Sequence, residues 1–351
     1  MYNGHNSAEI RGGYCLLRKA YVTDIVLLVV SLLVILLCSE LFTNGIEHLG
    51  VRLNMHQGAV GSILAAVGTA LPETVIPIIA IFVFRDAEAK QVAVGAIAGA
   101  PFMLGTLAFF VTGVAVLVYS ALGRRSRKMV VDDSIIVRDL SFFVVLYGIA
   151  VLTTFMHEVL WLRTAVAVAL LLSYIYYIIR TLGAKSFEME EPDRLYLGRI
   201  LRVRENLFWI ALQVAGAVAL MVYGAHMFVK SVEVVAATYG IAPLVLSILI
   251  TPVATELPEK FNSVIWIGRK RDVLALGNIT GAMVFQSSFP VAFGVAFTDW
   301  DLHGTTMLSA ILAFSSALLV LAWAKFRKTM NPYLLMAGGV FYATFLLYIF
   351  I

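Results

Sequence analysis

A short segment that contains a hydroxyl, a proline and a carboxylate occurs twice in the chain. It reads V-G-T-A-L-P-E in the first copy, which ends at Glu73, and V-A-T-E-L-P-E in the second, which ends at Glu259. The two threonines are Thr69 and Thr255. The separation between the two threonines equals the separation between the two glutamates. Each copy lies within a long apolar stretch, where a carboxylate is costly and is usually kept for function.

The chemistry of this segment suits a hard cation. Pro72 and Pro258 each remove a backbone donor, and a proline inside a helix clashes with the carbonyl four residues before it. We therefore expect helices broken at these prolines, with carbonyl, hydroxyl and carboxylate oxygens close together. Ca²⁺ takes 6–8 such oxygens, and no cluster of Cys or His offers a site for a softer metal. The alternative is a kinked helix whose glutamate has a structural role.

Composition places these segments in a membrane. Apolar residues make up 61% of the 351 residues and charged residues 14%, against about 25% charged residues in soluble domains. Two cysteines are too few for a disulfide framework or a metal site. Residues 1–20 form a polar tail without the pattern of a signal peptide. No nucleotide-binding loop or nucleophile motif appears in a convincing context, so we expect neither an enzyme nor a nucleic-acid partner, and no cofactor.

Ten apolar stretches are long enough, or nearly so, for the roughly 20 residues that cross a membrane as a helix. The stretch at 140–156 is the shortest. They cover residues 22–48, 58–84, 91–121, 140–156, 159–180, 206–238, 242–267, 273–298, 304–324 and 332–351.

The connections between these stretches carry most of their Lys and Arg on one face, opposite both termini. The positive-inside rule makes that face cytoplasmic and the termini extracytoplasmic, in a plasma (inner) membrane. A polar cytoplasmic connection at 181–205 separates a first repeat at 21–180 from a second at 206–351. Because five crossings is an odd number, the second repeat enters the membrane in the opposite sense. The predicted fold is therefore an all-α membrane protein of ten helices in two inverted five-helix repeats, with Glu73 and Glu259 near the midplane.

These segments resemble the cation/Ca²⁺ exchanger superfamily, which includes the sodium/calcium exchangers. That family has two inverted repeats, each with G-T-S-x-P-E on one helix and G-N-x-x-G-S-N on the next. Gly68–Glu73 and Ala254–Glu259 match the first element, and Gly277, Asn278 and Gly281 match the second, for which Gly95 and Gly99 are the weaker counterpart in the first half. Glycines four apart also permit close helix packing. The resemblance covers nearly the whole chain.

The chain departs from the family pattern at oxygen-bearing positions. The signature serine is Ala70 in the first copy and Glu256 in the second, and Gln286 is the polar residue after the second glycine element. In relatives the missing oxygens help to hold Na⁺, so we expect this site to bind fewer Na⁺ ions than its relatives do, or none. Lys260 lies four residues after Glu256, the favourable order for an ion pair on a helix. It either locks Glu256 structurally or stands in for a transported cation.

The sequence thus predicts a secondary active cation antiporter that exchanges Ca²⁺ for Na⁺ or H⁺ by alternating access, with cations as substrates and the lipid bilayer as its surroundings. A proton-coupled divalent cation exchanger and a cation channel or sensor that does not cycle remain alternatives. Further candidates for the site are Asn278, Gln286 and Lys260. The predicted ligands of the ion are Thr69, Glu73, Thr255, Glu256 and Glu259.

Overall fold

Long apolar helices build the whole of the described chain in the computed structural model, which contains no strand within the residues it describes. The backbone is described for residues 6–52, 65–131, 133–156, 158–182, 194–202, 206–327 and 329–351. Within these helices, the side chains of residues 6–22, 47, 50–51, 65–71, 182, 254 and 257–262 are not described.

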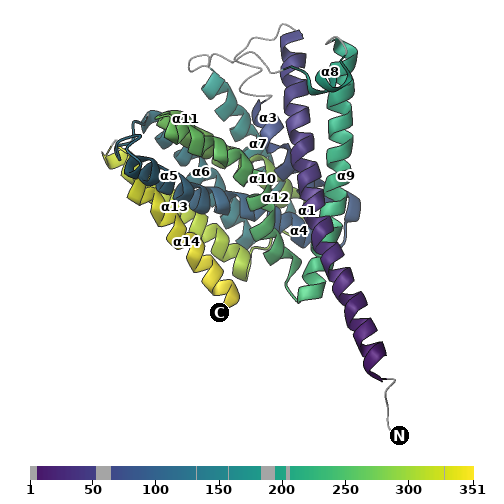
Figure 1. Ribbon diagram of the computed structural model, residues 1–351. Coiled ribbons are helices and arrows are strands. Elements are labelled where there is room, and N and C mark those ends of the chain that lie inside the picture. Colours follow the sequence, from purple (N-terminus) through teal and green to yellow (C-terminus); the bar gives the residue numbers. More distant parts are fainter. Residues whose placement is uncertain are drawn as a thin grey trace.

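The helices of the first half follow the predicted apolar stretches (Figure 1). Two of them contain or end in a π-helical turn, η2 and η3, and one ends in a short 3₁₀ turn, η4. They are α1 (Asn6–Arg52), α3 (Ala65–Ile79), η2 (Ala80–Phe84), α4 (Ala87–Met103), η3 (Leu104–Ala108), α5 (Phe109–Ala121), α6 (Asp133–Thr153), η4 (Thr154–Met156) and α7 (Leu160–Leu182).

The second half begins with a short helix in the connecting segment and continues with long ones. These are α8 (Tyr196–Leu201), α9 (Leu207–Tyr239), α10 (Pro243–Gly268), α11 (Asp272–Gln286), α12 (Phe289–Phe297), α13 (Gly304–Arg327) and α14 (Pro332–Phe350).

Local sequence signals set the helix ends. The side chain of Asp86 accepts a hydrogen bond of 2.7 Å from the backbone N–H of Ala89 at the start of α4, and Asn206 caps α9 in the same way. Gly240 ends α9 with a φ of 67°, a left-handed conformation in which glycine carries no steric penalty. Pro243 then starts α10, since a missing N–H costs nothing in the first turn.

Eight helices in the described residues are long and apolar enough to cross a membrane. The other two predicted crossings are represented there by shorter apolar segments, Pro72–Phe84 and Pro243–Val253. The first segment covers the end of α3 and η2, and the second lies in α10; α3 and α10 are the helices that carry the repeated motif. The all-helical class is confirmed, and the count of ten crossings stays a prediction.

The predicted helix breaks at Pro72 and Pro258 are wrong. Helix α3 continues from Ala65 to Ile79 through Pro72, and α10 continues from Pro243 to Gly268 through Pro258. A proline frees one carbonyl, but in a helix bundle neighbouring groups can satisfy it while the helix continues with a local adjustment. The interruptions occur elsewhere, in the third apolar stretch of each half. There, η3 separates α4 from α5, and Ser287 and Ser288 separate α11 from α12.

Helices α4 and α10 approach each other unusually closely. A Cβ atom on Gly95 would lie 2.5 Å from the carbonyl oxygen of Leu244, and one on Gly99 would lie 2.6 Å from that of Ile248. Only glycine permits this contact, which confirms the predicted packing role in the first half. Gly281 and Gly277 do not make such a contact with any described residue, so the prediction fails for them within this part of the chain.

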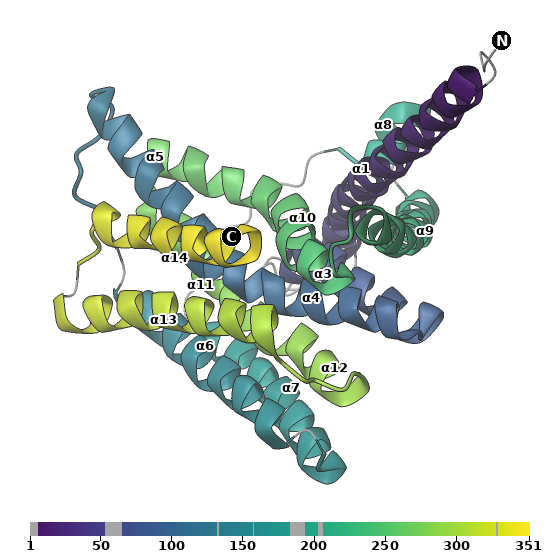
Figure 2. The ribbon, with the colours of Figure 1, turned by 90° about the horizontal axis from the view of Figure 1, so that it is seen from below.

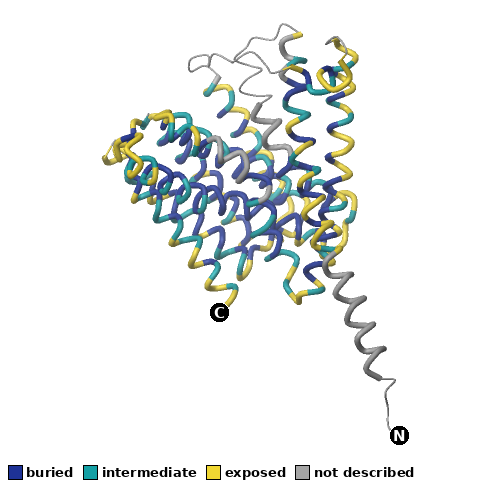
Figure 3. The backbone as a smooth tube through the Cα atoms, viewed as in Figure 1, coloured by how far each residue is buried: buried dark blue, intermediate teal, exposed yellow. Residues whose placement is uncertain are grey.

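Two hydrophobic clusters organise the packing. One joins α4 to α7 with α10 to α14, and the other joins α1, α3, the start of α4, α9 and Leu246 of α10. Helix α1 lies alongside α9, apart from the layer formed by α13 and α14 (Figure 2). Buried positions are concentrated where the two groups meet around α4 and α10, whereas exposed positions follow the outer faces (Figure 3). The motif helices are therefore at the centre of the bundle.

Other helix pairs form a regular pattern. Helix α12 packs against α7, and α14 packs against α5. Helix α11 packs against α6, and α4 packs against α13. Helix α3 packs against α1, and α10 packs against α9. In each of these three pairs of contacts, the two contacts correspond. Numbering the long helices of each half in chain order, the second contact of a pair is formed by the helices that have the same positions in the other half as those of the first.

Buried amides attach the connecting segment to α1 and α9. Asn44 accepts a hydrogen bond of 3.1 Å from the backbone N–H of Tyr196, and Gln213 accepts one of 2.7 Å from that of Leu197. The Gln213 amide also donates to Asn44 Oδ1 at 3.0 Å. The start of α8 is thus held by one side chain from each half.

A buried ion pair joins two other loops, the one after α5 and the one between α10 and α11. The guanidinium of Arg125, after α5, contacts both carboxylate oxygens of Asp272, at the start of α11, at 2.6 and 2.8 Å. The side chains of both residues are 2% exposed. Arg125 also donates to the carbonyl of Ile267 at the end of α10, and Asp272 accepts from the backbone N–H of Val130. Both partners are therefore fully enclosed and satisfied.

Candidate ion-binding site

The described carboxylates of the repeated motif are buried at the centre of the bundle. Glu73 on α3 is 5% exposed and both of its carboxylate oxygens are buried. Glu256 on α10 is 2% exposed, and Thr255 beside it is 3% exposed. Helix α3 contacts both α4 and α10, so these groups come from neighbouring helices. A buried carboxylate is strongly disfavoured unless its charge is compensated, and a bound cation compensates it directly.

Three predicted residues have side chains outside the described part of the structure. The backbones of Thr69, Glu259 and Lys260 lie within α3 and α10. Glu259 follows Thr255 by four residues in α10, and Thr69 precedes Glu73 by four in α3. Residues four apart are one helical turn from each other, so the predicted ligands of each motif are grouped along their own helix.

Gln286 and Glu256 are in direct contact. The amide Nε2 of Gln286, at the end of α11, donates a hydrogen bond of 2.7 Å to Oε1 of Glu256. This orientation leaves Gln286 Oε1 as an acceptor; it is buried and has no hydrogen-bond partner among the described residues. A carbonyl oxygen in such a position is a suitable ligand for a hard cation. The structure thus brings a second-rank candidate next to a predicted ligand.

Asn278 is placed differently. Its amide donates a hydrogen bond of 3.3 Å to the hydroxyl of Ser263, which itself donates to the carbonyl of Ala275. Asn278 and Gln286 are both on α11, and eight residues correspond to about 12 Å along a helix. Asn278 therefore ties α11 to α10 more than two turns away from the contact between Glu256 and Gln286.

A series of hydroxyl groups on α10 leads to the motif. Ser247 donates to the backbone carbonyl of Val92 at 2.8 Å and is 3.1 Å from the hydroxyl of Thr251. Thr255 donates to the carbonyl of Thr251 at 2.8 Å, and all three hydroxyl side chains are buried. The spacing of four residues between Ser247, Thr251 and Thr255 is the sequence signal for this series. It gives α10 a polar stripe toward α4 in an otherwise apolar bundle.

Asp139 on α6 is a buried carboxylate that hydropathy did not reveal, since it lies just before the predicted stretch at 140–156. It is 1% exposed. Oδ1 accepts from Arg138 at 2.9 Å and from the Tyr177 hydroxyl at 3.0 Å, and Oδ2 accepts from Thr280 at 2.8 Å. With these partners the carboxylate has a structural role, tying α6 and α7 to α11.

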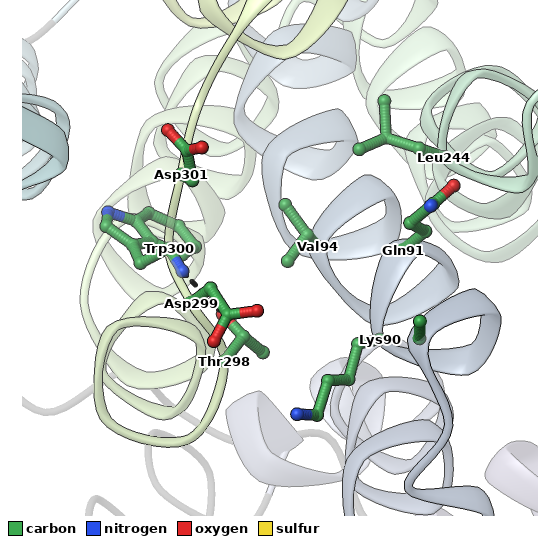
Figure 4. Close-up of a pocket in the computed structure, with 9 residues that line it drawn as sticks. Lys90, Gln91, Val94, Leu244, Thr298, Asp299, Trp300 and Asp301 are labelled. Carbon is green, nitrogen blue, oxygen red and sulfur yellow. Dashed lines mark hydrogen bonds between the residues drawn. The ribbon is translucent and has the colours of Figure 1, made fainter. Parts of the chain in front are cut away.

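A cavity of about 280 Å³ opens between the starts of α4 and α10 and the loop after α12 (Figure 4). Lys90 on α4 and Asp299 on the loop after α12 lie on opposite sides of it, and Val94 lines it one helical turn after Lys90. The loop that lines the cavity leads into the start of α13, which lies near the end of α14 (Figure 1). The cavity is therefore on the same side of the molecule as the end of α14. Buried Trp300 fixes its wall by donating from its indole Nε1 to the carbonyl of Ala150 at 2.8 Å. The cavity extends to the contact between α4 and α10, because it is lined by Val94, which precedes Gly95, and by Leu244.

The described side chains do not by themselves form a group of three His, Cys, Asp or Glu that could hold a metal ion. The described oxygen-bearing side chains of the motif and of α11 are Glu73, Glu256, Thr255 and Gln286, of which Glu256 and Gln286 are in direct contact. This donor set fits a hard cation and offers nothing to a soft one.

Comparisons with known proteins identify the family of the chain. Residues 23–183 and 209–351 match the sodium/calcium exchanger protein family. An uncharacterized membrane protein of Methanocaldococcus jannaschii is 23% identical over 291 residues, which cover 83% of this chain and 86% of that protein.

Solved structures share the fold. The H⁺/Ca²⁺ exchanger CAX has a TM-score of 0.68 at 16% identity, over 93% of this chain and 85% of that one. The sodium-calcium exchanger NCX_Mj has a TM-score of 0.57 at 17% identity, over 93% and 99%. Because the family match covers most of the chain and contains both copies of the motif, the chain belongs to the sodium/calcium exchanger protein family.

Proposed function

We propose that the protein is a secondary active antiporter that exchanges Ca²⁺ for Na⁺ or H⁺ across the membrane. The observation that carries this proposal is the burial of Glu73 and Glu256 on adjacent motif helices at the centre of the bundle. Structural relatives are named as exchangers of Ca²⁺ with H⁺ and of sodium with calcium. Such a site would open alternately to each side. It would be lined by Thr69, Glu73, Thr255, Glu256 and Glu259, with Gln286 as a further oxygen ligand.

The proposed architecture is ten crossings in two inverted repeats, at 21–180 and 206–351, joined by the connection at 181–205. The pattern of helix contacts supports it, because exchanging the two halves maps the contact of α12 with α7 onto that of α14 with α5. It likewise maps the contact of α11 with α6 onto that of α4 with α13. Two repeats related by a two-fold axis produce this exchange of contacts, and an odd number of crossings per repeat would make the second repeat inverted. By the positive-inside rule both termini would be extracytoplasmic in the plasma (inner) membrane.

Transport by purified protein in proteoliposomes tests exchange directly. We expect Ca²⁺ uptake only when the vesicles are loaded with a counter-ion, supplied either as an outward Na⁺ gradient or as an outward H⁺ gradient in separate experiments. A channel would admit Ca²⁺ down its own gradient with neither ion inside. Equal uptake by loaded and unloaded vesicles would therefore reject the antiporter and favour the channel.

Proton coupling is the second candidate, and the position of Glu256 favours it. This carboxylate replaces the family's serine, is buried and is bound by Gln286. Ala70, Ala100 and Ala282 lack hydroxyl oxygens that a Na⁺ ion stripped of water would need. Entry of a dication favours ionisation of a nearby carboxyl and deprotonation of a nearby ammonium, so Glu256 and Lys260 could release protons as Ca²⁺ binds.

We accordingly predict that Ca²⁺ flux responds to a pH gradient and that Lys260→Ala changes this response. In the variant the ammonium that competes with the transported cation is lost, so the dependence of flux on internal pH should shift. Initial rates of Ca²⁺ uptake at several internal pH values measure the effect, with Lys90→Ala, at the cavity mouth, as the matched loss of one lysine. Steep Na⁺ dependence with no pH response in the parent or in Lys260→Ala would exclude this coupling.

A further inference from the structure

Three loops form a single surface at the end of the molecule where α5 and α13 end and α11 begins. The buried pair of Arg125 and Asp272 joins the loop after α5 to the loop between α10 and α11. Met129 pairs with Met330 in an isolated antiparallel bridge, which adds the loop between α13 and α14. The three loops are therefore fixed relative to one another. We call their outer surface the basic platform.

The basic platform carries a dense positive charge. Its first two loops contribute six exposed basic residues: Arg124, Arg127, Lys128, Arg269, Lys270 and Arg271. Asp272, which directly follows Arg271, is buried against Arg125 and does not neutralise them. In the part of the chain that the structure describes, none of the six forms an ion pair with an acidic side chain. The charge is thus available to an anionic partner.

Exposed apolar side chains lie among these charges. Phe326 is 82% exposed at the end of α13, between the exposed basic residues Lys325 and Arg327. Val130 and Leu122, in and before the first loop, are 70% and 62% exposed. A surface that combines Lys and Arg with exposed apolar groups at the ends of membrane-crossing helices suits the boundary between headgroups and acyl chains.

We propose that the basic platform binds the headgroups of anionic phospholipids in the adjacent leaflet. Clusters of four to eight Lys and Arg next to a membrane helix attract acidic lipids. If these basic residues served only to set the orientation of the helices by the positive-inside rule, the loops that carry them would not need a fixed arrangement. Here a doubly hydrogen-bonded ion pair and a backbone bridge hold the basic side chains on one rigid surface before any lipid arrives, and such preorganisation lowers the entropic cost of binding. Because Arg125 also binds the last turn of α10, the lipid would contact the support of a motif helix.

Titration of the purified full-length protein with short-chain phosphatidylglycerol tests the proposal. Phosphatidylglycerol should bind at least about tenfold more tightly than short-chain phosphatidylcholine, since each basic residue near the surface contributes appreciably. The triple variant Arg269→Gln, Lys270→Gln and Arg271→Gln should weaken phosphatidylglycerol binding by about tenfold or more. The triple variant Arg194→Gln, Arg199→Gln and Arg202→Gln removes the same charge from exposed positions around α8, and it should bind as the parent does.

Equal weakening in both triple variants would overturn the proposal, because it would show a general effect of charge. Equal binding of the two lipids by the parent would overturn it as well, as would displacement of phosphatidylglycerol by millimolar inorganic phosphate. The charge-preserving variant Arg269→Lys with Arg271→Lys should retain binding. Thermal unfolding of each variant checks folding, and Arg124→Gln, Arg127→Gln and Lys128→Gln on the first loop replace the main variant if it does not fold.

Discussion

Glu73→Gln is expected to reduce Ca²⁺ flux at least about a hundredfold while the protein stays folded, and Glu259→Gln should do the same. Both substitutions keep the shape of the side chain and remove a negative charge, which at Glu73 lies in a buried position. A hydrogen bond to a charged group already contributes about 1.5–3 kcal/mol, and a loss of about 2.7 kcal/mol corresponds to roughly a hundredfold in rate. Initial uptake of radioactive Ca²⁺ into proteoliposomes measures the loss.

Glu40→Gln provides the matched control. Glu40 lies on α1, is exposed, and accepts a hydrogen bond of 3.0 Å from the hydroxyl of Tyr196. The same chemical change at this position should leave the flux within about twofold of the parent, since a surface hydrogen bond contributes little. Transport at the parent rate by Glu73→Gln or Glu259→Gln would show that the residue is not a principal ligand.

Asp272→Ala is expected to lower the free energy of unfolding by about 3–5 kcal/mol, because it leaves the buried guanidinium of Arg125 without its partner. The change should also loosen the first loop of the basic platform, since Val130 loses its side-chain acceptor. Thermal unfolding in detergent, followed by the fluorescence of a thiol-independent dye, measures the loss as a lower midpoint.

The double variant Arg125→Met with Asp272→Leu separates the cost of an unpaired charge from the cost of losing the contact. Replacing both partners with apolar side chains removes the uncompensated charge, so this variant should be more stable than Asp272→Ala. If Asp272→Ala unfolds at the midpoint of the parent, the pair does not stabilise the loops. If the double variant is less stable than the single one, burial of the charge is not the cause.

Helix positions could be predicted from the sequence wherever apolar length alone decides them. The stretches at 206–238 and 332–351 correspond closely to α9 (Leu207–Tyr239) and α14 (Pro332–Phe350). The predicted stretch at 140–156 starts too late, because α6 begins at Asp133 and contains Arg138 and Asp139. The free-energy cost of burying these two charged residues is offset by their mutual ion pair and by hydrogen bonds to Asp139 from Tyr177 of α7 and Thr280 of α11. Partners that are distant in the sequence are invisible to a hydropathy profile.

The candidate site was only partly predictable for the same reason. The repeated motif identified Glu73, Thr255 and Glu256, all of which are buried. The contact of Gln286 with Glu256 depends on how α11 packs against α10, and no spacing within one helix reveals it. The helix breaks predicted at the prolines were wrong. The local chemistry of proline predicts a break, whereas packing in the bundle keeps α3 and α10 continuous.

The two interruptions in the third apolar stretches differ, and this difference has an energetic consequence. In the first half, η3 keeps the chain helical from α4 into α5, whereas in the second half Ser287 and Ser288 end one helix before the next begins. If the halves of an inverted repeat were identical, exchanging them would convert the outward-open state into the inward-open one, and the two states would have equal energy. A π-helical turn opposite a two-serine turn removes that degeneracy. The empty carrier should therefore rest with unequal populations of its two orientations, and the rates of the two half-cycles should differ even without any ion gradient.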